Sequence, residues 1–155
     1  GGDQDAGGRG RDTRPPTVML TIAPMTPLDA RRGWNWIRRG LQEVIGRCGE
    51  SWLAEDAWTE IMAGTAFVWK IDAAHDEIGF VLLRRQNDFD GPVLFIWALY
   101  AEPQSLVRHG DELFDRLKEI AHRIGAKCIR MESSRKGWQG FDYFKPVKTI
   151  YEASV

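Results

Sequence analysis

Hydrophobic and polar positions follow a strand-like pattern through the middle of the chain. Strands are predicted there at Phe67–Asp72, Glu77–Arg85 and Val93–Tyr100, separated by a turn at Ala73–Asp76 and a polar loop at Gln86–Pro92. The third run is apolar at every position, which indicates a central strand covered on both faces. Gly79 marks a bulge or a close approach of two backbones. Further strands are predicted at Val18–Ile22, Lys127–Glu132 and Val147–Glu152.

Helical spacing occurs on either side of these strands. Apolar residues recur every three or four positions from Pro27 to a stop at Gly49, and again over about Leu53–Ala63. The clearest helical stripe follows a predicted loop at Glu102–Gly110 and ends at Gly125; it consists of Leu113, Phe114, Leu117, Ile120, Ala121 and Ile124. A short helix or turn is predicted at Trp138–Phe144. The resulting order, β-α-α-β-β-β-α-β-α-β, predicts a mixed α/β sheet with helices on both faces.

The first 18 residues differ from the rest. They hold five glycines in the first ten positions and two adjacent prolines, and they offer little apolar surface to bury. Residues 1–18 are therefore expected to form a disordered or extended arm, and residues 19–155 a single domain. The arm is either a remnant upstream of a natural start at Met19 or a segment that becomes ordered on a protein partner.

The composition of the chain argues against several classes of binding partner. The chain of 155 residues is 43% hydrophobic and 28% charged, and its formal net charge is -1. Such a balance argues against nucleic acid as a partner. The longest apolar run, Val93–Ala101, is too short to span a bilayer, so no membrane association is expected. The two cysteines, Cys48 and Cys128, have no zinc-ligand spacing, which predicts no metal site and suits the cytoplasm.

Two stretches carry a resemblance to a known family. The run VLFIWALY–EPQSLVRHG–DELFDRLKEIAHRIGA–KCIRME and the final segment GWQGFDYFKPVKTIYE resemble the GCN5-related N-acetyltransferase (GNAT) fold, over roughly residues 19–153. The Arg-Lys-Gly-Trp at 135–138 also resembles small acetyltransferase-like proteins of tailed phages, which makes a virion location the alternative to the cytoplasm. The resemblance implies a mostly antiparallel central sheet.

The resemblance also implies a site for acetyl-CoA. In that family the fourth and fifth strands diverge, and the pantetheine arm binds in the gap, here at Leu99, Tyr100 and Ala101. The pyrophosphate lies at the start of the next helix, here at Arg108, His109, Gly110 and Asp111. Only Gly110 of the family's glycines is present, and Asp111 and Glu112 bring negative charge. Arg108 and His109 offset that charge if binding is retained; otherwise the phosphate loop is degenerate.

The proton-transfer residues follow from the same resemblance. Tyr143 matches the family's general acid, and Glu102 or His109 is the nearest candidate base; the alternatives are a Tyr packed at the sheet rim and a loop-capping Glu. The implied function is acetyl transfer from acetyl-CoA to a primary amine of a small molecule or protein. The alternative is a catalytically degenerate interaction or virion assembly protein that does not bind CoA, to which seven tryptophans are suited.

One helix face carries unusual charge. Arg31, Arg32, Arg38 and Arg39 lie mostly off the apolar stripe. They form either a contact for an acidic acceptor or phosphate, or an ordinary solvated face. Trp36 also lies off the stripe and is a candidate for lining an acceptor pocket.

Overall fold

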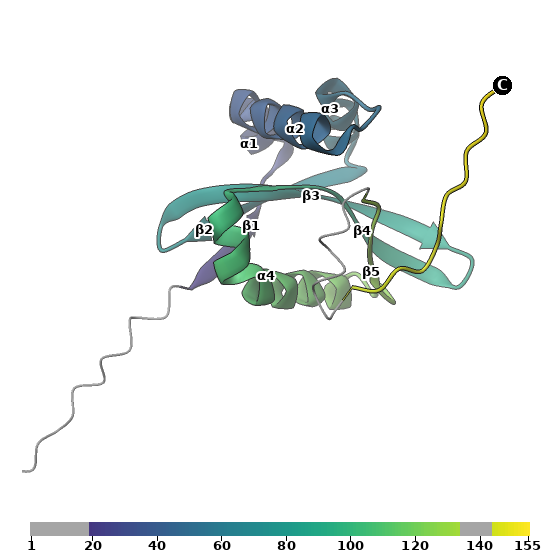
Figure 1. Ribbon diagram of the computed structural model, residues 1–155. Helices are drawn as coiled ribbons and strands as arrows, with labels where there is room; N and C mark the ends of the chain where they lie inside the picture. The colour runs from purple at the N-terminus through teal and green to yellow at the C-terminus, as the bar shows by residue number, and fades with distance from the viewer. Residues whose placement is uncertain (1–18, 134–143) are drawn as a thin grey trace, which may run out of the picture.

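The computed structural model describes residues 19–133 and 144–155 (Figure 1). The predicted arm at residues 1–18 and nearly all of the predicted short helix at Trp138–Phe144 lie outside the described residues. The described part contains one sheet of five strands in the order β1-β2-β3-β4-β5. They are β1 (Leu20–Pro24), β2 (Ala66–Ala73), β3 (Asp76–Asp88), β4 (Gly91–Ala101) and β5 (Ile129–Met131).

The sheet is mixed and mostly antiparallel, which confirms the predicted fold class. β1 to β4 pair with their neighbours in antiparallel fashion, and β5 runs parallel to β4. The parallel pair is possible because a helix joins the two strands, as a parallel connection requires.

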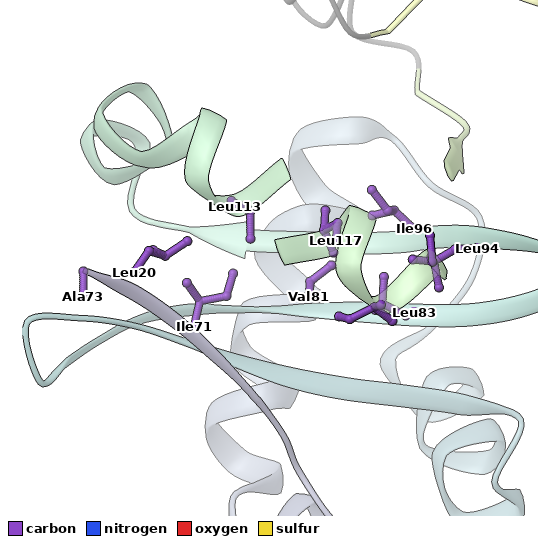
Figure 2. Close-up of a cluster of buried hydrophobic side chains, with 11 residues drawn as sticks. Leu20, Ile71, Ala73, Val81, Leu83, Leu94, Ile96, Leu113 and Leu117 are labelled. Carbon is purple, nitrogen blue, oxygen red and sulfur yellow. The ribbon is translucent and has the colours of Figure 1, made fainter. Parts of the chain in front are cut away.

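Helices cover both faces of the sheet (Figure 1). α1 (Pro27–Arg32), α2 (Trp34–Cys48) and α3 (Ala54–Ala63) lie on one face, and α4 (Pro103–Arg123) lies on the other. Each layer has its own apolar cluster. Figure 2 shows the cluster under α4, where Leu113 and Leu117 pack on strand residues that include Val81. The other cluster joins α1, α2 and α3 to the opposite side of β2, β3 and β4.

Local signals explain where the first helices begin and end. Thr26 and Asp29 form a reciprocal capping box at the start of α1. Gly33 then separates α1 from α2, so the single helix predicted from Pro27 to Gly49 is two helices. Gly49 and Gly64 end α2 and α3 in the left-handed conformation that glycine adopts without a steric penalty.

Two other predicted segments differ in the structure. The polar loop predicted at Gln86–Pro92 is mostly strand, because β3 and β4 stay paired out to Asp88 and Gly91 around a tight turn. The strand predicted at Val147–Glu152 is absent: residues 144–155 form no strand, and Val147, Ile150 and Tyr151 are exposed.

Candidate functional site

One edge of β4 has no strand partner among the described residues over the second half of the strand, and we call this stretch the open edge. β5 pairs with β4 only from Leu94 to Ile96, whose partner is Met131. β4 nevertheless continues to Ala101, and beyond Ile96 no strand of the described chain pairs with it on that side. Backbone N–H and C=O groups on such an edge are available to hydrogen-bond a ligand.

A bulge lies where the two strands part. Leu82 is opposite Ala98 and Leu83 is opposite Ile96, so Trp97 is an extra residue in β4. A bulge bends its strand and increases the local twist, and this one falls directly after Ile96, the last β4 residue that pairs with β5. The Trp97 ring is held by Trp52, with ring centroids 5.2 Å apart, and by the Arg84 guanidinium 4.9 Å from its centroid. Sequence reasoning missed this residue, because a bulge leaves no signal within a run of apolar side chains.

An ionic cluster holds β5 at the opposite end of the paired region. Asp88 contacts Arg130 at 3.0 Å and Lys127 at 3.3 Å, and Asp90 also pairs with Lys127. Hydrogen bonds from Arg130 and then Lys127 lower the pKa of the Asp88 carboxyl below its usual value. With β5 held near the β3–β4 hairpin, its pairing with β4 ends at Ile96 and Met131, and β4 continues alone on that side to Ala101.

The residues predicted to hold the pantetheine arm lie at the open end of β4. Leu99 packs on the cluster under α4, and Ala101 faces the same helix. Tyr100 faces α2 instead, with its ring 5.4 Å from that of Phe80. The open end is thus supported from both faces of the sheet.

Trp36 contributes to that support. Its ring packs edge-on against Phe80, with centroids 5.3 Å apart, so it is part of the core under α2. Gly40, one helical turn on, has no side chain to displace these rings: a Cβ there would lie 2.6 Å from Phe80 and 2.8 Å from Tyr100. The apolar pattern of this helix does not single out Gly40.

Gly79 fixes the end of β4 against β3. It pairs with Ala101, and a Cβ at this position would lie 1.9 Å from the Tyr100 carbonyl oxygen. The predicted close approach of two backbones is therefore confirmed. The Glu102 N–H donates to the Ile78 carbonyl at 3.2 Å and extends the contact by one residue.

The predicted loop at Glu102–Gly110 is wrong. α4 begins at Pro103, directly after β4, and Glu102 is its exposed N-cap residue. Proline is well suited to the first helical position, since it lacks the N–H that would remain unpaired there. Arg108 to Asp111, predicted to form a turn at the helix start, therefore lie inside the helix.

The side chains from Arg108 to Glu112 lie in different environments on α4. His109 lines a small apolar cavity between α4 and the sheet, beside Leu106 and Leu113. Arg108 and Asp111 are exposed. The Glu112 carboxylate accepts a hydrogen bond of 3.0 Å from the Leu20 N–H and so ties α4 to β1. Tyr143, the predicted general acid, lies outside the described residues.

The arginine face is exposed. Arg38 pairs with Glu55 on α3 at 3.0 Å. Arg31, Arg32 and Arg39 make no ion pair with any residue that the structure describes. Separately, no helix of the described chain combines the length and the apolar character needed to cross a membrane.

Comparison with known proteins identifies the fold. No protein-family model matches the sequence, and no curated protein matches it. Among solved structures, a GCN5-related N-acetyltransferase from Ralstonia eutropha is similar at a TM-score of 0.67 and 12% identity, covering 88% of this chain and 99% of that chain. A ribosomal-protein-alanine N-acetyltransferase from Brucella melitensis is similar at a TM-score of 0.62 and 12% identity, covering 88% and 98%.

A third similar structure is an aminoglycoside N-acetyltransferase in complex with CoA. The TM-score is 0.65 at 14% identity, and the match covers 91% of this chain and 98% of that chain. The chain therefore has the GNAT acetyltransferase fold, as the two sequence stretches predicted. At these identities the likeness establishes the fold and leaves the activity to be argued from the site.

Proposed function

We propose that this protein transfers an acetyl group from acetyl-CoA to a primary amine of a small molecule or protein. The observation that carries the proposal is the open edge of β4 after Ile96, beside the short strand β5. Two amides run along a pantetheine arm, and an extended chain of amides can pair with an unpaired strand edge. The CoA complex of a protein with the same fold supports the choice of donor.

The structure offers binding groups for the pantetheine arm of acetyl-CoA but not for its pyrophosphate at the predicted turn. The open edge offers backbone groups at Leu99, Tyr100 and Ala101 for the arm. When bound, the donor supplies the acetyl group as an activated thioester. The turn predicted for the pyrophosphate, at Arg108–Asp111, does not fit it, because these residues are helical and their N–H groups donate within α4.

Proton transfer requires a base for the amine and an acid for the departing thiolate. We assign the base to Glu102, an exposed carboxylate directly after the open end of β4. Tyr143 remains the predicted acid on the strength of its sequence position. In this proposal the exposed arginines Arg31, Arg32 and Arg39 favour an acidic acceptor.

An assay of thiol release from acetyl-CoA with a panel of primary amines tests the proposal. We expect amine-dependent release, lowered about 100-fold or more by Glu102→Gln or Tyr143→Phe, the scale at which a general acid or base contributes. Glu43→Gln on α2 and Tyr151→Phe near the C-terminus are matched controls at exposed positions and should leave the rate unchanged. Activity that both site variants retain would remove these assignments.

A second function is favoured by the start of α4. A helix that replaces the phosphate loop, with Asp111 and Glu112 on it, suits a protein that keeps the fold without binding CoA. Such a protein would act in assembly or in the virion, with residues 1–18 contacting a protein partner, whereas the enzyme would act in the cytoplasm. Calorimetric titration of the folded protein with acetyl-CoA separates the two, because only the enzyme binds.

A further inference from the structure

The N-terminus of α4 offers almost no anion-binding capacity. A helix usually presents several unpaired N–H groups in its first turn, and these are what hold phosphate. Here Pro103 has no N–H, and the N–H groups of Ser105 and Leu106 donate to the Glu102 carbonyl at 2.9 and 3.3 Å. Gln104 is the only residue of this first turn with an N–H left for a ligand.

Charge near this end of the helix is also unfavourable to an anion. Glu102 places a carboxylate at the N-cap, and Asp111 exposes another two turns later. Arg108 is the one arginine or lysine between Leu99 and Glu112. Within the described stretch from Leu99 to Asp111, the charged groups and backbone donors on offer to a pyrophosphate are one guanidinium and one N–H of the first turn, against two exposed carboxylates.

The other candidate donors in this part of the helix are already engaged in the fold. His109 is half-buried and lines the small apolar cavity between α4 and the sheet, beside Leu106 and Leu113. The backbone N–H groups from Arg108 to Asp111 belong to the body of the helix. The open edge of β4 is therefore the part of this site that has hydrogen-bonding groups to spare.

From these observations we infer that the donor is recognised through its acyl-pantetheine arm, and that the pyrophosphate and nucleotide contribute no affinity. This inference rests on the proposed acetyl transfer. The substrate class is thus an acyl-pantetheine thioester, whatever group is attached beyond the arm. Recognition comes from amide hydrogen bonds along residues 97–101, which are insensitive to salt, rather than from ionic contacts, which salt screens.

Calorimetric titration of the full chain with two donors tests the inference: acetyl-CoA, and S-acetyl-pantetheine, which lacks the phosphates and the nucleotide. We expect dissociation constants within about threefold of each other, a difference smaller than one hydrogen bond to a charged group contributes. The nucleotide half of CoA without its arm should not displace acetyl-CoA, and added salt should leave both constants unchanged.

The contrary outcomes separate the two proposals. Acetyl-CoA that binds more than about 30-fold tighter than S-acetyl-pantetheine, with competition by the nucleotide half, would overturn the arm-only inference and leave acetyl transfer standing. If the folded protein binds neither compound, both the inference and the proposed function fail. An amine-dependent thiol-release rate with S-acetyl-pantetheine matching that with acetyl-CoA would support the inference independently of calorimetry.

Discussion

Single residues at the open end of β4 are set by close packing. Gly79 lets the Tyr100 carbonyl approach β3, and Gly40 lets the rings of Phe80 and Tyr100 lie directly against α2. The first was predictable, because a glycine inside a strand pattern indicates a close backbone approach. The second was not, because a glycine inside a helix shows its purpose only when the opposing element is known.

The contrast between two glycines of α2 tests this packing. A Cβ at Gly40 would overlap Phe80, which is fully buried, whereas a Cβ at Gly46 would meet nothing within 4 Å. We expect Gly40→Ala to lower the free energy of unfolding by about 1–3 kcal/mol through overpacking. Gly46→Ala should raise it by about 0.5–1 kcal/mol, since alanine is the better helix former. Urea denaturation measures both, and equal effects of the two substitutions would contradict the packing described.

The bounds of helices and strands were predicted well where the apolar periodicity of the element is uninterrupted. They were predicted poorly where a glycine or proline interrupts it. β2 and α3 lie close to their predicted ranges because their apolar patterns end at clear stops. α4 begins earlier than predicted, because Gly110 resembles the end of a loop in the sequence pattern, although Pro103 is a good first helical residue. The apolar spacing of Leu106 and Leu113 continues through that glycine, whose cost of about 1 kcal/mol a long packed helix tolerates.

The first half of α4 makes a contact with β1 that can be tested by substitution. Glu112 accepts a hydrogen bond from the Leu20 N–H and joins α4 to the edge strand β1. Replacing it with alanine leaves that N–H without this partner, so we expect Glu112→Ala to lower the free energy of unfolding by about 1–3 kcal/mol. Asp111→Ala, at the adjacent exposed position, should change it by less than about 0.5 kcal/mol. If the two variants denature at the same urea concentration, the helix does not contact β1 in this way.

The ionic cluster between the β3–β4 hairpin and β5 predicts a dependence on pH. The pKa of Asp88 in the folded protein is lowered from 3.8, chiefly by Arg130 and Lys127. The carboxylate therefore stabilises the fold above the unfolded pKa, and this contribution is lost as pH falls through the lowered folded pKa. Asp88→Asn should flatten the decline of stability below about pH 3.8, measured by denaturation at a series of pH values. Asp111→Asn is the control, and an unchanged slope in Asp88→Asn would refute the cluster's role.

At the scale of the molecule, the order of the elements predicted the architecture, and the missing glycines together with Asp111 and Glu112 indicated that the phosphate turn departs from the family pattern. Helices on both faces of a mixed sheet followed from the alternating periods, and the mostly antiparallel arrangement followed from the family resemblance. The bulge at Trp97 depends on tertiary contacts, which local spacing does not encode, whereas the early start of α4 agrees with two local signals, Pro103 and the apolar spacing through Gly110. Tyr143, outside the described residues, stays a sequence-based prediction.

Amide hydrogen exchange along β4, followed with and without acetyl-CoA, tests the open edge most directly. For the free protein we predict slow exchange at Leu94–Ile96, where β4 is paired on both sides, and fast exchange for those amides of residues 97–101 that face away from β3. Acetyl-CoA should slow exchange at the second set and leave the first unchanged. Slow exchange along the whole of β4 before any donor is added, or donor binding that leaves residues 97–101 unaffected, would contradict the account.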